Sequence, residues 1–400
     1  MAPPATPGAT ARPDHAADAG VAAGNYLPEL ESLRGVAILL VFWFHVEGIL
    51  YMPYARPGAV GVPYQALVRA GHTGVSLFFV LSAFLLSLPF WREPRGGPYQ
   101  SIARYASRRA LRILPLYWFA VAVGTVVTAG SLADLGRALP HAFFLSTIAG
   151  LWTPLHPFSD VWWSLGTEVQ FYCFLPLLPL CRRWRHGVPL GIALIALGAV
   201  LHLLFLARVV GFSNGAAQYQ LADSSIGRGP QFAIGGAAAW LFLWLRANAP
   251  PAPAWWRNGG ADLALLAALT GLALVLQWVI NGGLLHFFVV PYHAWHIVEA
   301  LLWASVVLLV LLAPLRTRRL WSNPVLEWFG LLSYSIYMWH VPVAWYVIPW
   351  VRRTVVSVPA GWSGRGALTA LVVLALCLAV STLTYRWIER PFLLRKSRLR

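Results

Sequence analysis

Apolar segments of membrane-spanning length recur along this chain of 400 residues. A helix needs about 20 mostly apolar residues to cross the hydrocarbon core of a bilayer. Hydrophobic residues make up 58% of the sequence and charged residues only 11%, which excludes an ordinary soluble domain. The sequence therefore predicts an all-α, polytopic protein of the cell membrane with about ten transmembrane helices. The expected spans are 35–50, 73–90, 111–130, 160–180, 188–208, 229–246, 261–280, 288–313, 325–349 and 367–387.

Positive charge indicates how these helices are oriented. The chain has 30 Lys and Arg residues and a formal net charge of +16. When successive loops are assigned to alternate sides of the membrane, roughly three quarters of these residues fall on the side that holds the N-terminus. Loops rich in Lys and Arg stay in the cytoplasm. Both termini are therefore expected to be cytoplasmic. This alternation holds if the segment 138–152 is a re-entrant or interfacial piece and does not cross the membrane.

The chain is expected to form one transmembrane domain, over residues 26–392. Residues 1–25 are rich in Ala, Pro and Gly and lack the apolar core of a signal peptide, so they predict a disordered cytoplasmic tail. Residues 393–400 predict a short basic cytoplasmic tail. No appended soluble module is expected. Because the arginines lie in short loops between spans, no nucleic-acid partner is expected either.

The cysteines do not suggest a disulfide or a metal site. They show no CxxC spacing and lie in apolar runs, so we interpret them as packing residues. They are Cys173, Cys181 and Cys377.

Ionisable residues mark the first apolar segment: Arg34 opens it, and His45 and Glu47 interrupt it. Arg34 and His45 are eleven residues apart, about three helical turns, so they share one helix face and lie roughly 16 Å apart. His45 then falls near mid-membrane, where ionisable groups are costly and usually functional. The alternative is a core histidine with an arginine that reaches the interface.

A carboxylate is expected at a similar depth. Glu168 lies within WWSLGTEVQFY at 162–172, about 12 Å below the outer membrane edge if the helix enters near Asp160. A carboxylate at this level can orient an imidazole or raise its basicity. The alternative is that Glu168 pairs with an arginine only to be tolerated in the membrane.

An arginine cluster precedes the third span, in RYASRRALRILPLYW. Arg108 and Arg112 are four residues apart on one helix face, Arg104 is another turn back, and Arg109 lies beside them. Guanidinium groups bind phosphate through two parallel hydrogen bonds, so this face suits a phosphorylated ligand. The alternative is a plain cytoplasmic anchor that contacts anionic lipid headgroups.

The ninth span contains an unusually polar turn, in LLSYSIYMWHVP at 331–342. Ser333, Tyr334, Ser335 and His340 belong to it. Such side chains can hold a substrate or simply join helices through hydrogen bonds, and the second use is the commoner.

Histidines near the outer end of the eighth span are spaced like metal ligands, but they lack the frame of a known zinc motif. A metal site is therefore not predicted. The residues concerned are His286, His293, His296 and Glu299.

Five segments of the chain, taken in order, resemble the acyltransferase 3 family of integral-membrane acyltransferases. They are LESLRGVAILLVFWFH, RRALRILPLYW, WSLGTEVQFY, LLSYSIYMWHVP and YRWIERPF, and they extend over residues 27 to 392. The departures are Glu31 where Asp is usual, Gly166 and Thr167 in a looser WSLAVEEQFY, and Val169 where that motif has its second acid.

The resemblance implies transfer of an acyl group, most often acetyl, from cytoplasmic acyl-CoA to a hydroxyl of a carbohydrate or glycosylated acceptor. Arg34, His45, Arg108 and Arg112 match the family's functional arginines and histidine. Some family members carry an appended extracytoplasmic domain that completes the transfer. The chain is therefore expected to act alone or to pass the acyl group to a separate partner protein outside the membrane.

The resulting hypothesis is a membrane O-acyltransferase in which His45 acts as base or as transient acyl carrier and Glu168 orients it. Arg34, Arg108, Arg109 and Arg112 bind the donor. Ser333, Tyr334, Ser335 and His340 line the acceptor site, and the acceptor approaches along outer loops that include His293 and His296. Acyl-CoA is a co-substrate, and no bound cofactor or metal is expected.

Two alternatives remain from the sequence. One is a transporter or flippase of a polar or lipid-linked glycan, because buried charge also marks permeation paths. The other is a structural or assembly subunit. The clustered arginine face favours the enzyme, because a flippase is expected to distribute its ionisable residues along a path.

Overall fold

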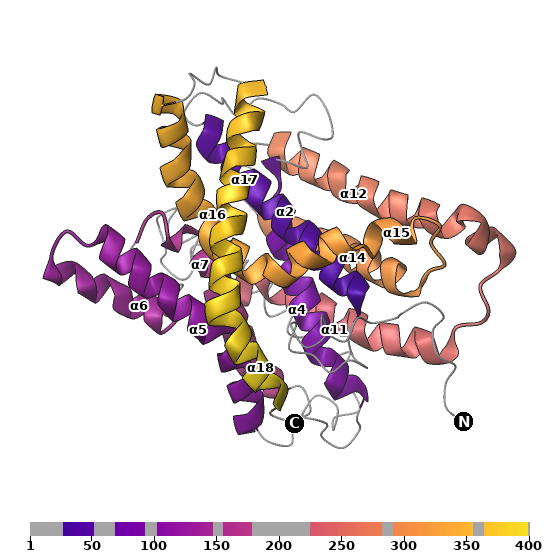
Figure 1. Ribbon diagram of the computed structural model, residues 1–400. Coiled ribbons are helices and arrows are strands. Elements are labelled where there is room, and N and C mark those ends of the chain that lie inside the picture. Colours follow the sequence, from indigo (N-terminus) through magenta and orange to yellow (C-terminus); the bar gives the residue numbers. More distant parts are fainter. Residues whose placement is uncertain are drawn as a thin grey trace.

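The computed structural model describes residues 27–51, 69–92, 102–146, 155–177, 225–281, 291–354 and 364–398. Every regular element in these ranges is helical, as the sequence predicts (Figure 1). The longer helices are α2 (Pro28–Tyr51), α4 (Thr73–Arg92), α5 (Ile102–Thr128), α7 (Trp162–Phe174), α11 (Ser225–Asn248), α12 (Ala261–Asn281), α14 (Pro291–Leu312), α16 (Pro324–Thr354) and α17 (Gly364–Thr384). The shorter elements are η3 (Leu132–Arg137), α6 (Ala138–Ala142), η4 (Ser159–Val161), η5 (Leu175–Leu177), η6 (Trp256–Gly260), α15 (Arg318–Trp321), η7 (Tyr385–Glu389) and α18 (Arg390–Arg398).

Six helical stretches in these ranges are long and apolar enough to cross a membrane, and each overlaps an expected span. They are Pro28–Leu50, Thr73–Arg92, Ile102–Thr128, Trp256–Asn281, Trp295–Leu312 and Gly366–Arg395. Helices α11 and α16 are long enough but less apolar, because they carry many of the polar residues discussed below. The chain is thus a multi-pass membrane protein. The count of ten spans and the cytoplasmic placement of both termini stay predictions.

Two of the expected spans and the two expected tails do not correspond to a described membrane-spanning helix or a described tail. Helix α7 has 13 residues, too few to cross alone the core that the span 160–180 was expected to cross. The expected span 188–208 and the expected tail 1–25 lie outside the described residues. At the other end the chain stays helical past residue 392 in α18, where Leu393 is fully buried.

The first part of the segment 138–152 does not form a spanning helix. Its helix α6 has only five residues, and the described part ends at residue 146. Tyr117 of α5 donates a hydrogen bond to the carbonyl oxygen of His141 at 2.8 Å, and His141 is completely buried. This piece is therefore folded against α5.

Of the cysteines, Cys377 packs in the core, as expected, while Cys173 is exposed on α7. Both are free thiols. Cys181 lies outside the described residues.

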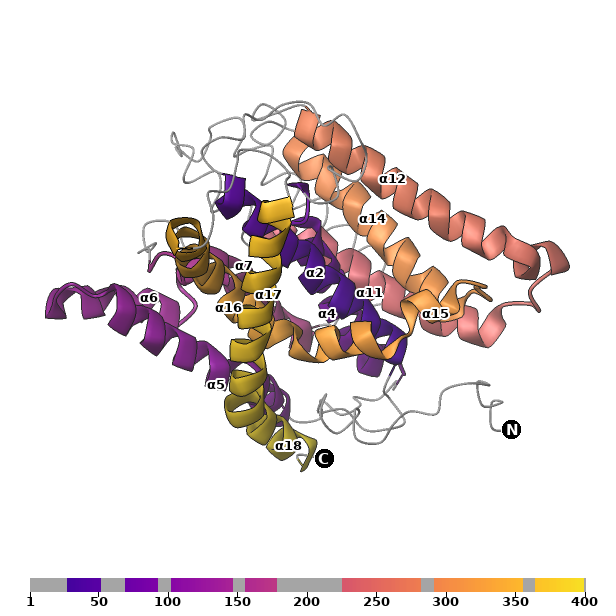
Figure 2. The same ribbon diagram turned by 45° about the horizontal axis from the view of Figure 1, so that its top comes forward.

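Helices α2 and α4 lie at the centre of the bundle, because both contribute to the two hydrophobic clusters of the core. One cluster joins them to α5, α7, α16 and α17, and the other joins them to α11, α12 and α14. Figure 2 shows this division, with α5 and α6 on the left, α12 and α14 on the right, and α2 between them.

Two glycines bring α2 and α16 into backbone contact. A Cβ atom on Gly35 would lie 2.1 Å from the carbonyl oxygen of Leu326, and one on Gly330 would lie 2.0 Å from that of Glu31. Any larger residue would push the helices apart, which is why small residues mark close helix pairs in membranes. This contact sets which side chains of α16 face His45.

Candidate active site

His45 of α2 faces His340 of α16. The Nδ1 atom of His45 lies 2.9 Å from the carbonyl oxygen of Val41 and 3.2 Å from Nε2 of His340. The ring centroids are 4.9 Å apart at an interplanar angle of 69°. His340 is completely buried. His340, which the sequence predicts as a lining residue, thus lies directly beside His45.

The backbone carbonyls assign a tautomer to each ring. A carbonyl oxygen only accepts hydrogen bonds, so a ring nitrogen that faces one carries the proton. Nδ1 of His340 lies 2.8 Å from the carbonyl oxygen of Tyr337 and 3.1 Å from that of Ile336, so its Nε2 is left as an acceptor. Nδ1 of His45 is likewise protonated, which leaves Nε2 of His45 with a free lone pair for a substrate proton.

Glu168 does not contact His45. Its carboxylate accepts hydrogen bonds from the hydroxyl of Ser82 at 2.5 Å and of Tyr172 at 2.6 Å. The expected pairing is wrong because residue counting gives depth along a helix and not which neighbours its faces meet. His340 occupies the place beside His45 that we expected for Glu168, and a catalytic role for Glu168 stays a prediction.

Arg34 and Arg112 are both held by carboxylates, on either side of α16. Arg34 donates hydrogen bonds to Glu31 and to the hydroxyl of Ser333, both at 2.9 Å. Arg112 donates to Glu389 at 2.7 Å, and Ser335 donates to the other oxygen of Glu389 at 3.0 Å. The Glu389 side chain is 1% exposed and that of Arg112 is 14% exposed. This pair is therefore a buried ion pair at the level of the polar turn of α16.

The remaining arginines of α5 are less deeply placed. Arg104 is exposed, and Arg108 and Arg109 are half-buried. The guanidinium of Arg109 lies 5.8 Å from the ring centroid of Tyr172, and its buried Nε has no hydrogen-bond partner among the described residues. Arg109 thus keeps its Nε donor for a further ligand, whereas Arg112 already donates to Glu389.

Tyr334 serves the contact between helices. Its hydroxyl donates to the carbonyl oxygen of Ile113 at 2.7 Å, and its ring lies 5.9 Å from the guanidinium carbon of Arg112. Tyr334 therefore joins α16 to α5, in the manner of a polar contact between membrane helices.

A polar and aromatic surface lies next to the histidine pair. Tyr337, three residues before His340, donates to the carbonyl oxygen of Val161 at 2.8 Å. The residue before Val161 is Asp160, whose carboxylate lies 2.7 Å from Nδ1 of His156. The His156 ring lies 4.2 Å from that of Trp345, which is 42% exposed. We call Asp160, His156 and Trp345 the acceptor surface.

Sequence reasoning missed two residues of this site. Glu389 lies in the YRWIERPF segment that carries part of the family resemblance, and that position was the available signal. Ser82, on α4, has no comparable signal, because a single serine in an apolar helix most often bonds its own backbone. The contacts with Arg112 and Glu168 identify both residues.

Comparisons with known proteins agree with these features. The model of the acyltransferase domain family matches residues 27–386. A putative membrane-bound transacylase, BcsY of Komagataeibacter xylinus, is 27% identical over 391 residues, which are 92% of this chain and 83% of that protein. No solved structure matches.

Two further relatives are longer proteins. A putative O-acetyltransferase of Staphylococcus aureus strain COL is 23% identical over 394 residues, and the peptidoglycan O-acetyltransferase OatA of Listeria monocytogenes is 22% identical over 392 residues. The match covers 92% of this chain in both cases, but only 57% and 56% of those proteins. Since the family model matches nearly the whole described chain, this multi-pass membrane protein belongs to the acyltransferase 3 family and is an acyltransferase.

Proposed function

We propose that this chain transfers an acetyl group from acetyl-CoA to a hydroxyl of a carbohydrate acceptor, with Nε2 of His45 as general base. The observation that carries the proposal is that Nδ1 of each histidine faces a backbone carbonyl oxygen, an arrangement that leaves Nε2 of His45 free to accept a proton. The names of the relatives, O-acetyltransferase and peptidoglycan O-acetyltransferase, support the acetyl group and the carbohydrate.

The proposed step is an attack of the acceptor oxygen on the thioester carbonyl. Nε2 of His45 takes the hydroxyl proton, the new C–O ester bond forms, and the C–S bond breaks. The imidazolium then gives its proton to the departing thiolate, so that free CoA leaves as a thiol. His340 stabilises the imidazolium, because its Nε2 accepts the hydrogen bond of Nδ1–H in His45. A neutral histidine fills the orienting role that a carboxylate has in many triads.

The donor phosphates are proposed to bind the arginines of α5 that precede the ion pair, namely Arg104, Arg108 and Arg109. The free Nε of Arg109 supports this assignment. From the level of Arg34 the pantetheine arm would extend about 16 Å along α2 to His45. Arg34 and Arg112 are already paired with carboxylates, so their proposed role is to hold the polar turn of α16 in place along this route.

The acceptor is proposed to approach over the acceptor surface. A sugar presents hydroxyl groups and an apolar ring face, which suit the carboxylate of Asp160 and the exposed ring of Trp345 respectively. The approach along His296 that the sequence suggests is wrong, because His296 is 1% exposed inside the bundle. The side chain of His293 is not among those described.

Sealed inside-out vesicles test this arrangement, because acetyl-CoA is too charged to cross the hydrocarbon core. With labelled acetyl-CoA added outside and native acceptor enclosed, we expect acetylated acceptor in the lumen and free CoA outside. Vesicles that contain His45→Ala measure the background. Acetylation restricted to acceptor on the same side as the CoA would place the chemistry at the cytoplasmic mouth and contradict the proposed route.

Substitution of Arg109 tests the donor site. We expect Arg109→Ala to raise KM for acetyl-CoA about tenfold or more, since a hydrogen bond to a charged group contributes about 1.5–3 kcal/mol. Arg109→Lys keeps the charge but loses the planar fork, so its KM should lie between those of the wild type and Arg109→Ala. Steady-state kinetics on reconstituted protein measure this.

The exposed Arg257 supplies a matched control, since it is predicted to lie on the same side of the membrane. Arg257→Ala should leave KM for acetyl-CoA unchanged. An equal increase in both variants would show a general effect of surface charge, and the specific site at Arg109 would be rejected.

A further inference from the structure

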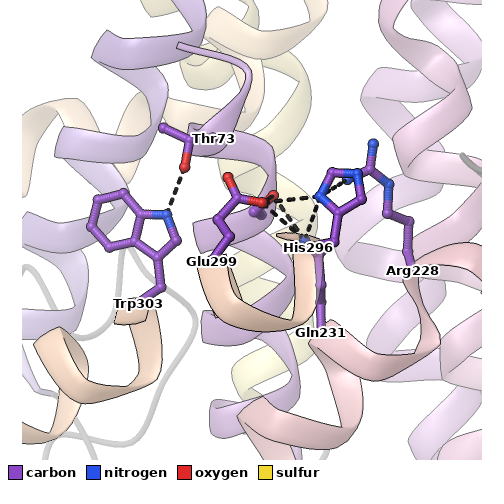
Figure 3. A network of polar contacts seen from close by, with 7 residues as sticks. Thr73, Arg228, Gln231, His296, Glu299 and Trp303 are labelled. Atoms are coloured by element: carbon purple, nitrogen blue, oxygen red, sulfur yellow. Dashed lines mark hydrogen bonds and ion pairs between the residues drawn. The ribbon is translucent and has the colours of Figure 1, made fainter. Parts of the chain in front are cut away.

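A second buried polar network lies in the other half of the bundle, between α4, α11 and α14 (Figure 3). All of its side chains are at least nine-tenths buried. They are Thr73 and Ser76 of α4, Arg228 and Gln231 of α11, and His296, Glu299 and Trp303 of α14. The proposed reaction does not use any of them.

Glu299 is the centre of this network. Its Oε2 atom accepts a hydrogen bond from the hydroxyl of Ser76 at 2.8 Å and lies 3.0 Å from Nδ1 of His296. Gln231 donates to the hydroxyl of Ser76 at 2.9 Å, and Nη1 of Arg228 lies 3.0 Å from Nδ1 of His296. Three helices are thus joined at one carboxylate.

The first turn of α4 is fixed by this network through two residues. Ser76 contacts both Glu299 and Gln231, and Thr73 accepts a hydrogen bond from the indole of Trp303 at 2.8 Å. In Figure 3 the bond between Thr73 and Trp303 lies beside the carboxylate of Glu299. The start of α4 is therefore tied to α14 at two successive points.

Two glycines, Gly71 in the turn just before α4 and Gly74 in its first turn, contact α2 beside His45. A Cβ atom on Gly71 would lie 2.1 Å from the carbonyl oxygen of Leu40, and one on Gly74 would lie 2.3 Å from that of Ala37. Successive helical residues are about 100° apart, so Gly74 and Ser76 face well-separated directions. The first turn of α4 is thus held between the network and the α2 turn that carries His45.

The contacted part of α2 also orients the ring of His45. Val41, whose carbonyl oxygen accepts the Nδ1–H of His45, would meet a Cβ atom on Gly74 at 2.8 Å. Phe44 would meet one on Gly71 at 2.7 Å, and the Phe44 ring lies 4.9 Å from that of His45. A shift of α4 would therefore move the neighbours that set the position of the base.

We infer that the network around Glu299 is a positioning device for His45, which acts through the first turn of α4. This inference rests on the proposed function, because it gives His45 the role of base. Ser76, Gln231 and Glu299 are positioning residues and do not contact the reacting atoms. Misplacement of a catalytic group by about 1 Å costs up to about 10²-fold in rate, so a network remote from the chemistry can have a large effect.

Ser76→Ala tests the inference, because it removes the hydroxyl that joins α4 to Glu299 and Gln231. We expect kcat to fall about ten- to a hundredfold while KM for acetyl-CoA stays unchanged. Ser87→Ala is the matched control, since Ser87 is a buried serine near the other end of the same helix. It should leave kcat unchanged.

Amide hydrogen exchange gives a readout that does not depend on activity. In α2 the amides of Val41 and Phe44 bond the carbonyls of Ala37 and Leu40, which are the oxygens that Gly74 and Gly71 contact. We expect faster exchange over residues 37–45 in Ser76→Ala and wild-type exchange in Ser87→Ala. Exchange over 324–332, where α16 contacts α2 near Glu31, should not change.

Glu299 supplies a conservative rescue. Glu299→Gln keeps an acceptor oxygen for Ser76, so its kcat should stay close to wild type, whereas Glu299→Leu should resemble Ser76→Ala. A loss of kcat in Glu299→Leu that Glu299→Gln does not restore would overturn the assigned role of the acceptor oxygen.

The exchange experiment separates failure of this inference from failure of the proposed function. Unchanged exchange over 37–45 in Ser76→Ala would overturn the inference, whatever the activity of His45→Ala. Full activity of His45→Ala would overturn the proposed function, while faster exchange would still show that the network holds α2.

Discussion

Replacement of His45 by alanine is expected to lower turnover by about 10²–10⁴-fold, the usual contribution of a general base. The side chain that is lost carries the only ring nitrogen of the pair that the hydrogen bonds leave free for a substrate proton. His45 is half-buried, and its partners among the described residues are Val41 and His340, so the substitution should leave the abundance of the protein in the membrane unchanged. Steady-state kinetics at equal protein concentration measure the effect.

Substitutions of His340 and Glu168 show whether the loss of turnover is specific to His45. His340→Ala should also lower kcat, but less, because the base remains while its orientation is lost. Glu168→Gln should cost less again, since its carboxylate binds Ser82 and Tyr172 and not His45. Near-normal turnover in His45→Ala would remove His45 from the reaction. An equal loss at His45 and His340 would instead identify a pair that acts as one unit.

Replacement of Glu389 by leucine is expected to lower the free energy of unfolding by about 3–5 kcal/mol, because it leaves Arg112 buried without its counter-charge. Glu389 also accepts the hydrogen bond of Ser335, so α5, α16 and η7 all lose a contact. Reversible unfolding in mixed micelles, followed by a spectroscopic probe, measures the change.

The double variant Glu389→Leu/Arg112→Met tests the cause of that loss. Removing both charges should recover most of the lost stability, since a buried ion pair and an apolar pair of similar volume are often about equally stable. As a matched control, the ion pair of Arg318 with Glu29 has an arginine that is 51% exposed. Glu29→Leu removes the carboxylate of this pair and leaves Arg318 in contact with water, so it should cost only about 0–1 kcal/mol. Equal losses at the two pairs would contradict the assignment of Glu389 to a buried site.

The sequence predicts the helices better than it predicts which side chains meet between them. Hydropathy and helix length place α2, α4, α5, α12, α14 and α17, because each stretch must satisfy its backbone hydrogen bonds inside the membrane. Residue counting along a single helix also yields the predicted depths of Arg34, His45 and the polar turn at 331–342, which stay predictions.

The contact partners of a side chain depend on which faces of neighbouring helices meet. Residue counting along one helix does not give this information. The contact of Gly35 with Leu326, and of Gly330 with Glu31, turns α16 so that His340 faces His45. Glu168 has a similar depth, but its carboxylate meets α4 at Ser82. In the same way, the spacing of His296 and Glu299 resembles that of metal ligands, whereas their partners Arg228 and Gln231 come from a helix nearly seventy residues earlier in the sequence. Packing selects these partners.

Mass spectrometry of envelope glycans and lipids from the host organism tests the central claim most directly. A strain that lacks this chain should lose the mass increment of one acetyl group from a specific glycan or glycolipid. Wild-type protein should restore that increment, and His45→Ala at equal membrane abundance should not. Restoration by His45→Ala, or an unchanged set of acetylated species in the strain without the chain, would contradict acetyl transfer with His45 as the base.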